Sequence, residues 1–376
     1  MMGDIRRRSV TYIVAQQVAI RSEEKADIDR VDFISTGCTL LNLAASQKGR
    51  KGGWARGRII NIVGDKSTCK TLLTLEAFAQ AFYNIKKIKS TLWPTPSKIS
   101  LVYNNGEGVM DLPVERMYGQ RFVDAVEWIP DGNNERQGPM TCEGFGRDLL
   151  GRIDKLQKGE ALFYAMDSLD SLMPESGVNK MEKSIKTGDA LEVGYGSGMA
   201  KANYFSNEFF GNLCSRMAGK DVTVFMISQI RDIINAQSFG EKKKRTGGKA
   251  LDFYAHQVPW LAQVGKLKNK FGDESRVYGT TNKALFKKNK CGIPFREAEF
   301  NILFNYGIDD IMSCAEFLTP AELTEVHGGK RMSREEFVKL ADDNSEIKEK
   351  LINAVEKKWA LIEENTRVCR NDRWGG

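Results

Sequence analysis

Four runs of apolar residues along the chain have the length of β-strands. They cover residues 59–63, 99–103, 161–166 and 222–228. Stretches with helical spacing of apolar positions follow at 70–86, 112–119, 142–157 and 199–218. This alternation predicts an α/β fold with a mainly parallel central sheet and crossover helices.

Each apolar run leads into polar residues suited to triphosphate chemistry. The first leads into the loop at 64–71, and the others lead to Glu107, Asp167 and Gln229. Ligands of parallel α/β sheets bind beyond the carboxyl ends of the strands. We therefore expect these polar side chains to meet in one site at that edge.

The rest of the chain is predicted to extend the sheet and then to become helical. Residues 258–264, 276–286 and 298–304 are rich in strand formers and are separated by turn residues. From residue 307 the pattern is helical, with a capping box at Ser333 and Glu336 and a long helix over 345–364. Near the start, Val10, Ile13 and Val18 indicate one amphipathic helix.

The loop after the first strand has the composition of a phosphate-binding loop. Its backbone N–H groups can wrap phosphates, Lys70 can reach the β and γ groups, and the Thr71 hydroxyl can bind Mg²⁺. A nucleoside triphosphate and Mg²⁺ are thus the expected ligands. The loop consists of Gly64, Asp65, Lys66, Ser67, Thr68, Cys69, Lys70 and Thr71.

Cys69 stands where the usual phosphate-loop pattern has glycine. If the backbone there is left-handed, a side chain costs about 1–2 kcal/mol. A thiol beside Lys70 at a helix N-terminus can also have a lowered pKa, so a redox role is an alternative to an inert small side chain.

Three further residues complete a hydrolytic site. Asp167 is expected to support the magnesium shell, although an aspartate after a buried strand can also cap the next turn. Glu107 is the candidate general base, and Asp111 is the competing carboxylate in the nucleotide site. The amide of Gln229 can hydrogen-bond a γ-phosphate and report its loss to the segment that follows.

That following segment is a basic loop, which indicates a polyanion such as DNA as partner. A solvated loop tip is the alternative, and Ile234 could equally form local core rather than wedge between bases. A second flexible loop is expected at 173–196. The DNA-binding candidates are Arg231, Ile234, Lys242, Lys243, Lys244, Arg245, Gly247, Gly248 and Met199.

Bulk composition narrows the class of protein only moderately. The net charge of +7 over 376 residues supports nucleic-acid contact weakly. No apolar stretch reaches the ~20 residues that cross a bilayer, so we expect no membrane contact and a cytoplasmic location. The chain has two histidines, which are too few for a His-rich metal site.

These motifs, in this order over residues 32–307, resemble the RecA family of homologous-recombination ATPases. Glu107 with Asp111 is similar to the family's catalytic glutamate region, Asp167-Ser168 to its Walker B motif and Ser228-Gln229 to its switch glutamine. Residues 34–42 and 246–255 also match. Lys288 and Lys290 resemble the two lysines that reach the ATP of the neighbouring subunit.

The resemblance implies a RecA-like P-loop ATPase core, at 34–306, with an N-terminal oligomerisation segment at 1–33 and a C-terminal helical domain at 307–376. It implies a helical filament on single-stranded DNA that exchanges strands with double-stranded DNA, in a bacterial cell or phage-infected host and associated with the nucleoid. Cys69, and Val114 in place of a base-stacking tyrosine, depart from the family. An ATP-gated DNA-coating filament or mediator with little hydrolysis, and a ring helicase, are the alternatives.

Overall fold

A computed structural model describes residues 31–88, 90–108, 110–130, 140–187, 196–232, 243–245, 248–368 and 370. The predicted N-terminal helix therefore lies outside the described residues. The same holds for three of the DNA-binding candidates, Ile234, Lys242 and Gly247.

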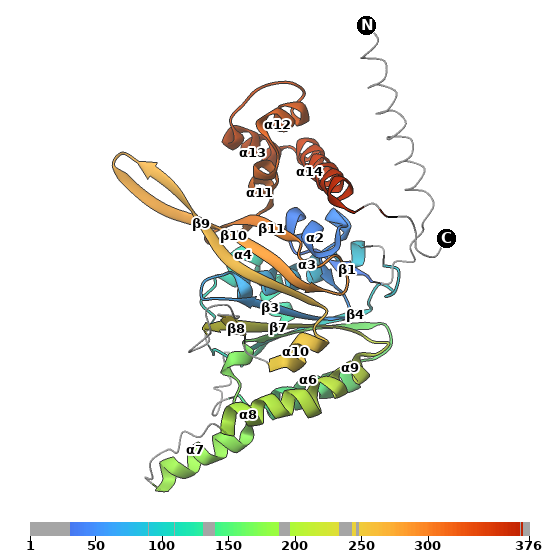
Figure 1. The fold of residues 1–376 in the computed structure, drawn as a ribbon, viewed down its shortest axis with the longest axis vertical. Helices are drawn as coiled ribbons and strands as arrows, with labels where there is room; N and C mark the ends of the chain where they lie inside the picture. The colour runs from blue at the N-terminus through green and yellow to red at the C-terminus, as the bar shows by residue number, and fades with distance from the viewer. Residues whose placement is uncertain are drawn as a thin grey trace.

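A ten-stranded sheet forms the centre of the molecule (Figure 1), in the order β12-β11-β10-β9-β3-β7-β6-β4-β5 with β8 paired to β7. Strands β9, β3, β7, β6, β4 and β5 run parallel, and β10, β11 and β12 add antiparallel pairs. The predicted α/β class with a mainly parallel central sheet is confirmed. The strands are β3 (Ile59–Gly64), β4 (Lys98–Asn105), β5 (Val126–Ile129), β6 (Glu160–Asp167), β7 (Asp221–Asp232), β8 (Lys243–Arg245), β9 (Gln257–Phe271), β10 (Glu274–Asn289), β11 (Glu297–Leu303) and β12 (Gly307–Asp309).

Helices cover both faces of this sheet, which explains why its central strands are apolar along their length. All six residues of β3 are buried. One face packs against α2 (Thr39–Ser46) and α3 (Lys70–Asn84), and the other against α6 (Cys142–Lys155), α9 (Phe210–Met217) and α10 (Gly248–Tyr254). The shorter helices are α4 (Val114–Tyr118), α5 (Gln120–Ala125) and α8 (Gly196–Asn203), and a π-helical turn at Tyr204–Phe209 joins α8 to α9.

Two segments expected as flexible loops contain regular structure. Residues Glu175–Thr187 form helix α7, whose last two turns hold helix-forming Met181, Glu182, Lys183 and Lys186. In the basic segment, strand β8 (Lys243–Arg245) pairs antiparallel with the end of β7 at Ile230, Arg231 and Asp232, so these two strands form a β-hairpin.

The end of the chain is helical, as the sequence predicts. It forms α11 (Asp310–Phe317), α12 (Pro320–Val326), α13 (Arg334–Asp343) and α14 (Ser345–Thr366). The predicted capping box is present, with Ser333 N donating to Glu336 Oε2 at 2.9 Å and Glu336 N donating to Ser333 Oγ at 3.2 Å. A second capping box, Thr319 with Glu322, begins α12.

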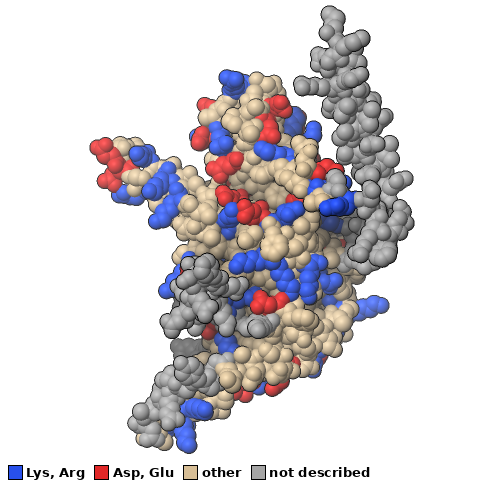
Figure 2. Space-filling view, viewed as in Figure 1, with Lys and Arg blue, Asp and Glu red and all other residues tan. Residues whose placement is uncertain are grey.

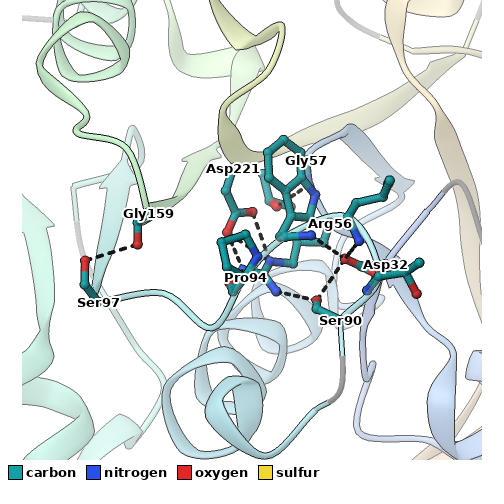
Figure 3. A network of polar contacts seen from close by, with 12 residues as sticks. Asp32, Arg56, Gly57, Ser90, Pro94, Ser97, Gly159 and Asp221 are labelled. Carbon is teal, nitrogen blue, oxygen red and sulfur yellow. Dashed lines mark hydrogen bonds and ion pairs between the residues drawn. The ribbon is translucent and has the colours of Figure 1, made fainter.

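A polar network fixes residues 90–97 at the amino end of the sheet, opposite the phosphate loop (Figure 3). The Asp32 carboxylate accepts from Ser90 Oγ at 2.8 Å and from the backbone N–H groups of Thr91, Leu92 and Trp93 at 2.7–2.9 Å. The guanidinium of Arg56 pairs with Asp221 and donates to Ser90 Oγ at 2.9 Å. The two-residue strand β1 (Phe33–Ile34), which follows Asp32, pairs with β2 (Trp54–Ala55) of the same chain.

Among the described residues, no helix is both long and apolar enough to span a membrane.

Candidate functional site

The loop between β3 and α3 folds into a cradle whose shape depends on small residues and left-handed backbone. Lys70 Nζ donates to the Asp65 carbonyl at 2.6 Å, and Thr68 Oγ1 donates to the same oxygen at 2.7 Å. Ser67 and Cys69 have φ angles of 56° and 59°. A Cβ at Gly64 would lie 2.3 Å from Thr68 Oγ1, so a larger residue at the end of β3 would push into the loop.

Cys69 takes the left-handed conformation that the missing glycine would favour, with φ 59° and ψ 21°. The side chain is tolerated at an expected cost of about 1–2 kcal/mol. Burial raises the pKa of its thiol well above the usual range, and the nearby Lys70 only partly opposes this rise. The structure does not support the alternative of a lowered pKa, because desolvation outweighs the attraction of Lys70 for a thiolate.

Lys70 is half-buried at the base of the cradle. Burial lowers the pKa of its ammonium group, while Asp167 and Glu107 oppose that shift. In this structure the Lys70 ammonium donates a hydrogen bond to the Asp65 carbonyl of the same loop. That carbonyl is a weaker hydrogen-bond partner than a phosphate oxygen. The group is therefore placed to exchange that contact for a bound anion.

Asp167 and Thr71 meet directly at the carboxyl ends of the strands. Thr71 Oγ1 donates to Asp167 Oδ2 at 2.6 Å, and the hydroxyl of Tyr103 donates to the same oxygen at 2.6 Å. Burial and the charge of Asp167 raise the pKa of Tyr103 well above its usual value, so the phenol stays protonated and remains a donor. Asp167 is thereby oriented toward the helix that carries Lys70 and Thr71.

Glu107 and Gln229 come from neighbouring parts of the same edge and contact each other. Gln229 Nε2 donates to Glu107 Oε1 at 3.0 Å, although the two residues are 122 positions apart in the chain. The backbone N–H of Gln229 donates to Asp170 Oδ2 at 2.8 Å, which ties β7 to the turn after the Asp167 strand. Gln229, the candidate γ-phosphate sensor, thus contacts both Glu107, the candidate base, and the turn that follows Asp167.

Residues 66–71, Glu107, Asp167 and Gln229 line one cavity of about 980 Å³, the Lys70 cavity. That volume is at the upper end of ligand sites in proteins. Asp111 also lines it, together with Met110, Met117 and Phe304 at an apolar end. Val114 does not, since it is only 7% exposed and packs into the core.

The donor set fits a nucleoside triphosphate with Mg²⁺. A cradle of backbone N–H groups and one lysine suits polyphosphate, and Mg²⁺ at such sites takes one or two protein oxygens plus phosphate and water. Thr71 and Asp167 offer such oxygens. Within the described residues no cluster of three His, Cys, Asp or Glu side chains could hold a metal alone.

The described DNA-binding candidates are placed differently from one another. Met199 is 67% exposed. Arg245 is buried and paired with Asp252, so it differs from the expected surface cation, and burial lowers the pKa of its guanidinium. Of Arg231, Lys243, Lys244 and Gly248 the structure describes only the backbone.

Lys288 and Lys290 lie outside the Lys70 cavity of their own chain. Lys288 Nζ donates to the carbonyls of Asp252 and Phe253, and Lys290 Nζ donates to Phe253 at 3.1 Å. Burial and the neighbouring Lys290 lower the pKa of Lys288 to about 8. The two lysines therefore cap the C-terminal end of helix α10 and place two positive charges close together at one surface.

Sequence reasoning missed several residues of the site. Nothing in the sequence distinguishes Tyr103 from the other residues of its apolar run, and Asp170 has no local sequence signal. Gln263 and Lys266, on β9, also line the cavity because β9 runs beside β3 and continues past its end. Only the strand order, which the sequence does not state, brings β9 next to the phosphate loop.

The family model of the RecA N-terminal domain matches residues 157–309, which run from the Asp167 strand through β12. The matched part contains Asp167, Gln229, Lys288 and Lys290 and begins after the phosphate loop.

Along most of its length the chain is similar to RecA. It is 29% identical over 356 residues to Protein RecA of Rippkaea orientalis, covering 91% of this chain and 87% of that protein. It is 29% identical over 323 residues to Protein RecA of Syntrophobacter fumaroxidans, with 83% and 80% covered. It is 27% identical over 347 residues to Protein RecA of Chlamydia abortus, with 89% and 86% covered.

Proposed function

We propose that this chain is a RecA-like, DNA-dependent ATPase that forms a helical filament on single-stranded DNA and promotes pairing and strand exchange with double-stranded DNA. The similarity to RecA proteins over most of the chain supports the class. The contact between Gln229 and Glu107 beside Lys70 is the observation that carries the proposal. The proposed setting is the cytoplasm of a bacterial cell or phage-infected host, with association with the nucleoid.

The proposed division of labour follows from where the side chains lie. Residues 64–71 and Lys70 hold the phosphates, and Thr71 and Asp167 support Mg²⁺. Glu107 takes a proton from the attacking water, and Asp111 lies in the nucleotide cavity. Bound Mg²⁺ supplies charge stabilisation at the phosphate oxygens.

Gln229 is the proposed link between nucleotide and DNA. It directly precedes Ile230, the first residue of β7 that pairs with β8 of the basic segment. A γ-phosphate that draws the Gln229 amide away from Glu107 would shift the end of β7 and with it that hairpin. Segments 173–196 and 231–249 are the proposed DNA-binding surfaces, with Met199 beside the first.

Filament assembly rests on two proposed contacts with neighbouring subunits. Residues 1–33 form the proposed oligomerisation segment on the core at 34–306, and 307–376 form the C-terminal domain. Lys288 and Lys290 would reach the ATP of the next subunit, and their exclusion from their own cavity is compatible with that role.

ATPase activity with and without single-stranded DNA tests the proposal. We expect DNA to stimulate the parent chain, Lys70→Ala to abolish turnover, and electron micrographs to show helical filaments on DNA. Hydrolysis that is indifferent to DNA would contradict the proposal, and closed rings would favour a helicase on the same fold.

A second candidate is an ATP-gated DNA-coating filament or mediator with little hydrolysis. The left-handed Cys69 favours it because it strains the phosphate loop, and the buried Val114 favours it because it offers no ring to stack on a base. DNA binding that requires ATP with almost no turnover would support this candidate, and steady turnover at ordinary recombinase rates would exclude it.

A further inference from the structure

The hairpin of β9 and β10 extends well beyond the rest of the sheet and projects from the body of the molecule (Figure 1). Strand β9 pairs with β3 only at Gln257, Trp260 and Leu261. From Ala262 to Phe271 its outer edge has no partner strand in the part of the chain that the structure describes. An unpaired strand edge offers a row of N–H and C=O groups to another extended chain.

The side chains of this edge have a definite pattern. Every residue of β9 from Gly265 to Phe271 has a partner in β10, and the irregularity between Val277 and Gly279 adds its extra residue to β10, so alternate residues of β9 share a face. Lys266, Lys268 and Lys270 therefore lie on one face of the hairpin. None of these three ammonium groups has an ion-pair partner within the described residues.

The same edge is open to solvent and partly apolar. Val264 is 50% exposed and Phe271 is 91% exposed. Lysine and arginine side chains line the projecting hairpin in Figure 2, while acidic side chains gather at its tip, where Gly272 and Asp273 form the turn and Glu274 begins β10. An extended chain lying along the edge would meet lysines first and carboxylates only at the end.

From these observations we infer that the β9 edge binds an extended acidic peptide of a partner protein by strand addition. The backbone edge supplies the hydrogen bonds, and the alternating lysines select carboxylates at every second position. The inference goes beyond the proposed ATPase and DNA-binding function and does not depend on it.

Lysines on an edge strand can also serve only to prevent edge-to-edge aggregation. They do so by repelling strands that carry like charge, and an acidic strand escapes that repulsion. A nucleic acid could use the lysines but not the row of backbone groups. The lysines and the unpaired backbone edge together therefore favour an acidic peptide. An experiment can distinguish peptide binding from nucleic-acid binding and from protection against aggregation alone.

The site has a second consequence, because its near end borders the phosphate loop. Gly64 pairs with Leu261, and the next residues of β9 continue past the end of β3, where Gln263 and Lys266 line the Lys70 cavity. A bound strand would thus lie beside the cavity mouth. For a clean test the variants should change only Lys268 and Lys270, which do not line that cavity.

The test uses the full chain and a fluorescein-labelled peptide of alternating glutamate and valine. Controls are a peptide of the same composition with all glutamates in one block, the alternating peptide with N-methylated backbone amides, and a short labelled oligothymidylate. We expect the alternating peptide to bind best. The blocked and N-methylated peptides should each bind about tenfold more weakly, as lost strand pairing requires.

Lys268→Glu/Lys270→Glu should weaken binding of the alternating peptide by at least about tenfold, because it replaces two attractive cross-strand pairs by repulsive ones. Lys155→Glu/Lys158→Glu makes the same change of charge on exposed residues at the end of α6 and should leave binding unchanged. An unchanged thermal transition shows that each variant is folded.

Hydrogen exchange of backbone amides measures strand pairing directly, because charge attraction alone would not protect these amides. The alternating peptide should protect backbone amides within 262–271 of β9. Equal binding of the blocked peptide, binding that survives Lys268→Glu/Lys270→Glu, or an absence of protection in 262–271 would each overturn the inference. Tighter binding of the oligothymidylate through the same two lysines would assign the surface to nucleic acid instead.

Discussion

The Arg56–Asp221 pair is expected to be one of the most sensitive points of the fold. Its two side chains are 2% and 7% exposed. Arg56 Nε lies 3.0 Å from both Asp221 carboxylate oxygens, and the other guanidinium nitrogens reach Ser90 Oγ and the Pro94 carbonyl at 2.9 and 3.5 Å (Figure 3). Burial raises the pKa of Asp221 although Arg56 opposes the shift, so the pair is strongly desolvated.

Asp221→Ala would leave the Arg56 guanidinium buried with only the two oxygens of Ser90 and Pro94. Removing one partner of a buried pair typically lowers the free energy of unfolding by about 3–5 kcal/mol. Replacing both, as in Arg56→Met/Asp221→Leu, removes the desolvation cost as well and should recover most of that loss. The two single changes and the double change therefore should be strongly non-additive.

Urea unfolding followed by circular dichroism and tryptophan fluorescence measures these free energies. The matched control is Arg276→Ala, which breaks the exposed pair with Glu274 and should cost less than about 1 kcal/mol. A loss below about 1 kcal/mol for Asp221→Ala, or additive single changes, would refute the reasoning from burial.

Three further predictions concern the site and its supports. Cys69→Gly should relieve about 1–2 kcal/mol of left-handed strain and tighten ATP binding, measured with a fluorescent ATP analogue, whereas Cys69→Ala should not. Glu107→Gln should keep ATP bound but slow its hydrolysis at least about a hundredfold in single-turnover assays; normal turnover would remove Glu107 as the base. Burial alone would raise the pKa of Asp32, but hydrogen bonds from Ser90 and the 91–93 backbone outweigh it and lower that pKa. Asp32 therefore adds to the free energy of unfolding above the unfolded pKa near 3.8, and this contribution is lost as the pH falls through the lower folded pKa. The difference in unfolding free energy between parent and Asp32→Asn should therefore shrink in that acid range, and a constant difference would contradict this.

Much of the fold follows from local pattern. The four apolar runs, the helices between them and the Ser333 capping box are encoded within windows of a few residues, and the structure contains each of them. The gathering of Glu107, Gln229 and Asp167 at one edge follows from the rule that parallel strands end together.

What the sequence did not reveal depends on partners far apart in the chain. Asp32 bonds residues 58 to 61 positions away, and Arg56 pairs with a residue 165 positions away. The burial of Arg245 depends on Asp252 and on the packing of α10, and nothing in a run of basic residues marks one of them as internal. The free β9 edge likewise follows only from strand order.

The central claim is that Gln229 transmits the presence of a γ-phosphate to the proposed DNA-binding segments at 173–196 and 231–249. It is tested most directly by the affinity for labelled single-stranded DNA with a non-hydrolysable ATP analogue and with ADP, in the parent chain and in Gln229→Ala. We predict that the parent binds DNA much more tightly with the analogue, and that Gln229→Ala binds the analogue normally but holds DNA equally with both nucleotides. A variant that keeps the full difference between the two nucleotides would contradict the account.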